Sequence, residues 1–315
     1  MKRRGFIFLT LASSIWFSCS SDLENNTDDA MDSSNFMLNI TFIMDTNADR
    51  LDNLGNPVDI PEGNAAQNPD FEVLGLHFIG LYPNKFTPFE NGATVFSSPT
   101  TDQGGTSAID FEHELFLTES DNTISIPLNS IASGTYEYFR SSIGFQQYKI
   151  TYNLSGISNL DNSWPTGIND DIDVSGTVAS FLGFNTFIDS YMIEKQTVTV
   201  NGNKLQGYFG LETTGDIQGF PFNYLSEEDA PETTVPNPIS DTSPVPEGSC
   251  VVTGIFLSPL IIPESPKEDV NIQMVISINN SFEWKDPNGN GKYEPLLGEQ
   301  VVDMGTRGVF PTILN

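Results

Sequence analysis

Apolar and polar residues alternate with a period of two along much of the chain. Four apolar side chains share one face in each of two clear examples, Leu38, Ile40, Phe42 and Met44, and Tyr148, Ile150, Tyr152 and Leu154. This alternation is typical of half-buried antiparallel strands. No stretch longer than about ten residues keeps a helical period, and 26 Gly and 20 Pro interrupt the chain throughout. The sequence therefore predicts an all-β fold, an antiparallel β-sandwich with long loops.

The first 18 residues have the composition of an export signal. Three cations at residues 2–4 precede the apolar run Phe6–Phe17, and Cys19 follows it. A helix that spans a bilayer needs about 20 apolar residues, so this shorter run fits a cleaved signal peptide better than a permanent span. The pattern resembles a bacterial lipoprotein signal, which implies that residues 1–18 are removed and that Cys19 carries lipid. Residues Ile15–Ser18 depart from the usual lipobox, and an ordinary secreted protein is the alternative.

The segment that follows, residues 19–35, is dominated by Ser, Asp, Asn, Thr and Glu. It is too polar to bury enough surface to offset its ordering entropy, so we predict a flexible, lipid-anchored tether. A short acidic stretch after the lipid cysteine resembles the export signal of surface lipoproteins in Bacteroidota-type bacteria. That resemblance implies an outer-membrane protein, anchored by lipid at the cell surface. The alternative is a plain spacer in a lipoprotein that faces the periplasm.

The remaining chain divides by composition into three parts. Residues 36–225 hold most of the predicted strands and form the main β-sandwich. Prolines and acids crowd out apolar residues in 226–249, which indicates a long loop or linker. Residues 250–315 are too few to form a large hydrophobic core of their own, so we expect their strands to complete the sandwich. A small separate C-terminal domain is the alternative.

The chain is strongly acidic, with 13 Lys and Arg against 42 Asp and Glu and a formal net charge of −29. Removal of the signal peptide would take away three of those cations. Nucleic-acid binding requires Lys and Arg to displace the counterions of phosphates, so this composition excludes it. Divalent cations are the natural partners of such a chain.

The sharpest chemical motif begins at Asp286. Oxygen-bearing side chains occupy its first, third and fifth positions, as Asp286, Asn288 and Asn290, and Gly291 at the sixth permits a sharp turn. Calcium takes six to eight oxygen ligands at about 2.3–2.6 Å, and this spacing lets several side chains converge on one ion. The carbonyl of Lys292 would be the ligand at position seven.

The end of the motif departs from a helix-flanked calcium loop. Glu294 occupies position nine, but Leu297 stands where a glutamate is expected, and the nearest acid is Glu299. The motif therefore resembles the broader calcium loops of secreted bacterial proteins. We predict bound Ca²⁺, and the alternative is an Asn-Gly turn that holds no metal. The predicted ligands are Asp286, Asn288, Asn290, Lys292, Glu294 and Glu299.

A weaker cluster lies near the first predicted strand. Asp45, Asn47 and Asp49 alternate there, but Arg50 stands where a calcium loop needs glycine. We interpret this segment as a polar turn with an Asp–Arg ion pair.

Catalytic templates are missing from the sequence, which contains no HExxH or GxSxG motif. Glycan cleavage requires a pair of carboxylates, but in so acidic a chain some pair lies at a suitable distance by chance. The acids are therefore no evidence for a glycan-active enzyme. His77 lies in an apolar strand and is interpreted as a strand residue. Trp164, in the loop DNSWPTG, either stacks on a sugar or a partner, or packs on the sandwich.

The N-terminal half is similar in strand order to the β domain of MbnP-like copper-binding proteins. The similarity runs from residues 38–42 through 75–81 to 133–136 and 143–144. It implies copper chemistry that needs histidine and a modified tryptophan, for which only His77 and Trp164 can be named.

These observations favour a lipid-anchored lipoprotein of the cell envelope that acts as a non-catalytic binding or structural module stabilised by calcium. Its partners would be the membrane, through the lipid, and a glycan or another envelope protein. A copper-handling protein and a glycan-active enzyme are the alternatives.

Overall fold

The computed structural model describes residues 36–52, 55–103, 108–160, 164–167, 169–181, 186–187, 190–199, 208–217, 219–229 and 251–314. Most of these residues lie in strands, and the one α-helix among them, α1, spans only Ile157–Leu160. Short 3-10 turns occupy Phe89–Asn91, Phe111–His113, Leu128–Ser130 and Pro295–Leu297. The predicted all-β fold is confirmed.

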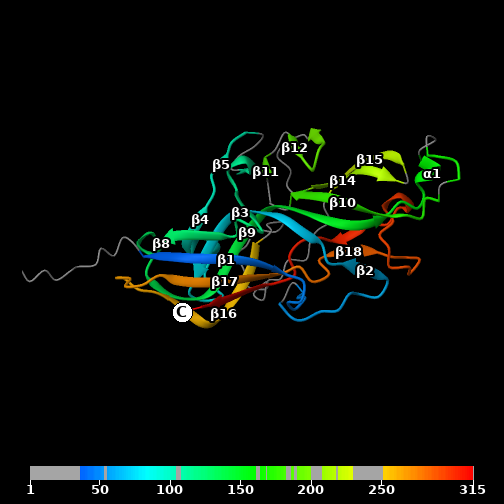
Figure 1. Ribbon diagram of the computed structural model, residues 1–315. Helices are drawn as coiled ribbons and strands as arrows, with labels where there is room; N and C mark the ends of the chain where they lie inside the picture. The colour runs from blue at the N-terminus through cyan, green and yellow to red at the C-terminus, as the bar shows by residue number, and fades with distance from the viewer. Residues whose placement is uncertain are drawn as a thin grey trace, which may run out of the picture. The chain divides into compact units, whose positions relative to one another are not determined.

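The first sheet joins strands from the two ends of the described chain. Its order is β20 (Val309–Ile313), β17 (Val270–Ser277), β1 (Met37–Asp45) and β8 (Thr123–Pro127). β1 and β17 run parallel, from Leu38 opposite Val270 to Asp45 opposite Ser277. Leu38, Ile40 and Phe42 are buried, as the alternation in β1 predicts. The C-terminal strands therefore share a sheet with the N-terminal strand (Figure 1).

A second, larger sheet is built around one long strand. Its order is β15 (Phe220–Asp229), β14 (Tyr208–Ile217), β10 (Asp173–Phe181), β9 (Gly134–Asn153), β3 (Asp70–Tyr82) and β4 (Ala93–Ser97). In addition, β16 (Val251–Ile262) pairs with β9, and β7 (Leu115–Thr118) pairs with β3. β9 is 20 residues long, and it pairs with β16 along its first half and with β10 along its second half. The strand β9 thus joins the part of the sheet that contains β16 to the part that contains β10, β14 and β15.

Three small sheets complete the fold. They consist of β19 (Val301–Asp303), β18 (Phe282–Lys285) and β2 (Asn64–Gln67); of β11 (Thr186–Phe187), β6 (Ala108–Asp110) and β5 (Thr100–Thr101); and of β12 (Ser190–Met192) with β13 (Thr197–Thr199).

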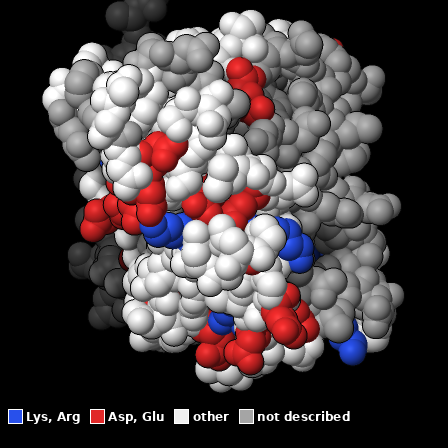
Figure 2. All heavy atoms as spheres, turned by 90° about the vertical axis from the view of Figure 1, so that its right-hand side faces the viewer, with Lys and Arg blue, Asp and Glu red and all other residues white. Residues whose placement is uncertain are grey.

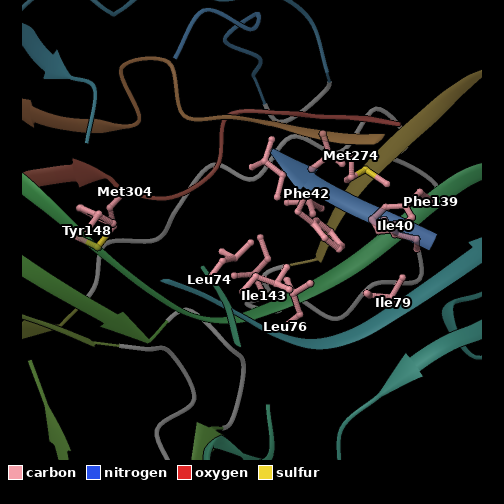
Figure 3. Close-up of a cluster of buried hydrophobic side chains, with 14 of the residues drawn as sticks. Ile40, Phe42, Leu74, Leu76, Ile79, Phe139, Ile143, Tyr148, Met274 and Met304 are labelled. Carbon is pink, nitrogen blue, oxygen red and sulfur yellow. The ribbon is translucent and has the colours of Figure 1, made fainter. Parts of the chain in front are cut away.

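The sandwich core lies between the first sheet and the larger one. Figure 3 shows Ile40, Phe42 and Met274 from the first sheet facing side chains of β3 and β9, among them Leu74 and Ile143. All five side chains are at least 97 % buried. Burial of a side chain of this kind contributes about 1.5–3 kcal/mol, so this cluster is a major source of stability.

An aromatic cluster extends the core beneath the second half of β9. The ring of Phe282 in β18 lies 6.3 Å from that of Tyr148 and 5.2 Å from that of Tyr293, measured between centroids. Trp284 is buried beside them, 5.6 Å from Tyr293. These contacts fix β18 and the segment that follows it against the large sheet.

Four charged side chains are buried near this cluster. Arg50 pairs with Glu283 and Arg307 pairs with Asp303. Asn64 donates a further hydrogen bond to Glu283. Burial raises the pKa of Asp303 to about 6, against the opposing effect of Arg307. The predicted pairing of Arg50 with a neighbouring aspartate is wrong, because its guanidinium turns inward to a strand far along the chain.

Another buried acidic side chain, that of Glu114, lies on the other side of the large sheet. Both carboxylate oxygens lack a hydrogen-bond partner, and the side chain is 6 % exposed. The carboxyl group occupies the space that a Cβ would need at Gly75 of β3 and at Gly144 of β9. Burial raises its pKa to about 8. Two glycines in neighbouring strands thus make room for one carboxyl group.

Two details of the topology differ from expectation. The sandwich is mainly antiparallel, but β1 pairs with β17, and β11 with β6, in parallel. The predicted loop 226–249 also begins later than expected, because residues 226–229 belong to β15 and pair with β14. The rest of that segment lies outside the described residues.

Candidate calcium-binding loop

The candidate loop follows β18 directly. At its start, the Asp286 amide donates to the Gly63 carbonyl at 3.0 Å, and the Lys285 amide donates to the Gln300 carbonyl at 2.9 Å. Deeper in the loop, the indole Nε1 of Trp284 donates to the Lys292 carbonyl at 3.0 Å. Because Trp284 is fixed in the aromatic core, the loop is held at both ends and in its middle.

Asp286 organises the turn through its carboxylate. Its Oδ1 accepts the amides of Gly289 at 2.9 Å and Asn290 at 3.2 Å, and its Oδ2 accepts the amide of Gly291 at 2.8 Å. Gly289 and Gly291 have positive φ values of 70° and 73°, a backbone region that favours glycine. The sequence can therefore wrap the backbone around one carboxylate, as a calcium loop requires.

The two asparagines face Glu294. Nδ2 of Asn288 donates to Oε2 of Glu294 at 2.6 Å, and Nδ2 of Asn290 donates to the same oxygen at 2.9 Å. Their Oδ1 atoms accept the amides of Asn290 and Lys292. The amide groups thus supply the positive dipoles that balance the Glu294 carboxylate.

Glu299 brings a third carboxylate to the loop. Its side chain is buried, and its Oε2 accepts the Glu294 amide at 2.7 Å, whereas Oε1 has no hydrogen-bond partner. Burial raises the pKa of Glu299, and the negative charges of Glu294 and Asp286 raise it further, although the hydrogen bond to the amide opposes them. A buried carboxylate oxygen without a partner costs free energy, and a cation bound beside it would remove that cost.

The loop is also tied to the neighbouring sheet. Nζ of Lys292 bonds to Asp171 at 2.5 Å, and Nδ2 of Asn153 donates to both Asp171 and Asp173. Figure 2, which faces the right-hand side of Figure 1, shows groups of acidic side chains on that face with fewer basic ones among them. Such a surface attracts cations.

These groups have the donor chemistry that calcium prefers, namely carboxylates, side-chain amide oxygens and a backbone carbonyl. Within the described ranges, no group of three or more His, Cys, Asp or Glu side chains converges closely enough to hold a metal by itself. Calcium would therefore depend on Asn288, Asn290 and the Lys292 carbonyl as well as on the acids. The two amides would have to turn their oxygens toward the ion.

The other predicted site residues do not come together. His77 lies in β3 at a bulge between Leu76, which pairs with Ile143, and Phe78, which pairs with Ser142, and burial lowers its pKa. Trp164 is half-buried, with its ring 6.2 Å from that of Phe222, in an aromatic group that includes Tyr152. The ten residues from Ser142 to Tyr152 span about 30 Å of strand. One copper ion therefore cannot contact both His77 and Trp164.

Cys19 and the predicted signal peptide and tether lie outside the described residues. Among the residues that are described, no helix is long and apolar enough to cross a membrane.

Sequence reasoning missed the buried carboxyl group of Glu114 and the buried pair of Arg50 and Glu283. Glu114 precedes an ordinary apolar strand, and the glycines that accommodate it are distant in sequence. The partners Arg50 and Glu283 are likewise far apart along the chain, so no local signal could have linked them.

No protein-family model, curated protein or solved structure matches this chain.

Proposed function

We propose that the protein is a lipid-anchored module of the cell envelope that binds calcium in the loop 286–299 and acts by binding rather than by catalysis. The observation that carries the calcium proposal is the buried, unpartnered Oε1 of Glu299 beside the charges of Glu294 and Asp286. The export part of the proposal is supported by the sequence before and around Cys19. The copper alternative gains no support, because His77 and Trp164 are far apart.

Calcium should act mainly on stability. The Asp286 carboxylate already organises the turn, so an ion would find the loop largely formed and would remove repulsion among three acids. An ion that binds only the folded state stabilises it by about 2.7 kcal/mol at a hundredfold excess over Kd. This role fits a structural calcium site in an extracellular module, where calcium is plentiful.

We predict that millimolar calcium raises the melting temperature of the purified protein and that magnesium raises it much less. Magnesium demands octahedral geometry and gives up its waters reluctantly. Glu299→Gln should abolish the calcium response while raising the melting temperature without calcium, because it removes a buried charge that repels Glu294 and Asp286. Differential scanning calorimetry after chelator treatment measures both effects.

Glu268→Gln is the matched control, because it removes one exposed charge from the segment before β17. It should leave the calcium response unchanged. Equal responses to calcium and magnesium in all variants would indicate general charge screening and would contradict a specific site.

A second prediction concerns the anchor. Cys19→Ala should leave the protein unacylated and release it from membranes, because the acylated cysteine supplies most of the attachment and the polar tether supplies none. Membrane fractionation followed by a high-salt wash tests this. Retention of the variant in the washed pellet would show that the lipoprotein proposal is wrong.

A further inference from the structure

A cavity of about 390 Å³ lies at one end of the sandwich, where β1 ends and β3 begins. Its walls come from residues 42–44 of β1, residues 69–74 at the start of β3, and residues 117–119 at the end of β7. Sites for small molecules commonly enclose roughly 300–1,000 Å³. The cavity is therefore large enough for a small organic ligand.

The floor of the cavity is apolar and belongs to the sandwich core. Phe42, Leu74, Leu117 and Ile278 line it and are themselves at least 96 % buried. Phe71 also lines the cavity but is only half-buried, so it offers apolar surface to a ligand. Figure 3 shows Phe42 and Leu74 on facing elements of this core.

The walls are fixed by backbone hydrogen bonds. The Phe42 amide donates to the Asn122 carbonyl at 2.8 Å, which ties β1 to the turn between β7 and β8. The Ile278 amide donates to the Asp45 carbonyl at 3.0 Å on the other side. A ligand would thus enter a cavity that is already formed, with little ordering cost.

The charged residues that line the cavity are all acidic. Asp70, Glu72 and Glu119 line it, and no Lys or Arg is among its lining residues. Glu72 is neutralised by Lys149, whose Nζ lies 2.7 Å from its Oε1. Lys149 also lies opposite Asp70 in the paired strands, so three acids share one cation and the rim of the cavity keeps a net negative charge.

We infer that this cavity binds a small organic cation, an ammonium group carried on an apolar body. The apolar part would lie against Phe71 and the core floor, and the ammonium would face Asp70 and Glu119. A ligand with a carboxylate or phosphate head would be repelled by the same two acids. The cavity shares no residue with the loop 286–299, so this inference is independent of the calcium proposal.

Three probes of equal length and different charge test the inference: phenylbutylamine, phenylbutanol and phenylbutyrate. Calorimetric titration of the full-length protein should show the amine binding most tightly and the acid not binding measurably. The double variant Asp70→Asn, Glu119→Gln should weaken binding of the amine roughly five- to tenfold. Both substitutions are at exposed positions, and melting curves check that the fold is retained.

Glu264→Gln with Glu268→Gln is the control, because it removes two exposed charges before the start of β17, at the other end of that strand from Ile278. It should leave the affinity for the amine unchanged. Equal affinities for amine and alcohol would overturn the inference, as would unchanged affinity for the amine in the Asp70/Glu119 variant.

Discussion

Glu114→Gln should remove a large pH dependence from the stability of this protein. The pKa of Glu114 is raised by burial from 4.5 to about 8, so the folded state holds a proton that the unfolded state releases. Protonated Glu114 therefore does not lower the free energy of unfolding below pH 4.5. The pH dependence begins above that value and concerns the free energy of unfolding of the whole protein. That free energy falls by about 1.4 kcal/mol per pH unit as the pH rises toward 8. At pH 8.5 the glutamine variant should be more stable than the parent by several kcal/mol, and at pH 4.5 the two should be similar.

Urea unfolding at a series of pH values measures this difference. Glu112→Gln serves as the control, because Glu112 is exposed two residues earlier in the chain. That control should follow the parent at every pH. If the difference between the Glu114 variant and the parent is the same at pH 4.5 and 8.5, then Glu114 does not retain its proton in the folded state.

Arg50→Met should destabilise the protein by about 3–5 kcal/mol, the usual effect of breaking a buried ion pair. Arg50 and Glu283 are both nearly inaccessible, with side chains 6 % and 5 % exposed. Removing Arg50 leaves two buried carboxylates, Glu283 and Asp303, with Arg307 as their remaining cation. The uncompensated charge of Glu283 is the source of the expected loss.

The double variant Arg50→Met, Glu283→Met should recover much of this loss, because the remaining pair of Arg307 and Asp303 is balanced. A double-mutant cycle in denaturant unfolding gives the interaction energy between Arg50 and Glu283. Additive losses in the double variant would mean that the two side chains act through packing and not through their charges.

The strands could be predicted from the sequence because side-chain alternation is a local property. Leu38, Ile40 and Phe42 are buried in β1 as their spacing predicts, and Tyr148, Ile150 and Tyr152 are buried in β9. The parallel pairing of β1 with β17 could not be predicted, because it joins segments more than 200 residues apart and no turn connects them. A similar distance separates Arg50 from Glu283, and the glycines that make room for Glu114 lie on two other strands, at positions 75 and 144.

The candidate loop could likewise be predicted only in part. The spacing of Asp286, Asn288 and Asn290 is local, and the tight turn around Asp286 follows from it. The sequence predicts Glu299 as a ligand although it lies two positions beyond the usual acidic ligand, but it does not show how the side chain reaches the loop. In the structure Gly298 adopts a φ of 88° after the 3-10 turn, and the Glu299 carboxylate reaches back to the Glu294 amide. That return depends on backbone geometry that no residue count reveals.

Calcium titration of the chelator-treated, full-length protein by isothermal calorimetry tests the central claim most directly. The account predicts one calcium ion bound per chain, much weaker binding of magnesium, and loss of the calcium signal in Glu299→Gln with no loss in Glu268→Gln. Absence of calcium binding to the folded parent protein, or undiminished binding to the Glu299 variant, would contradict it.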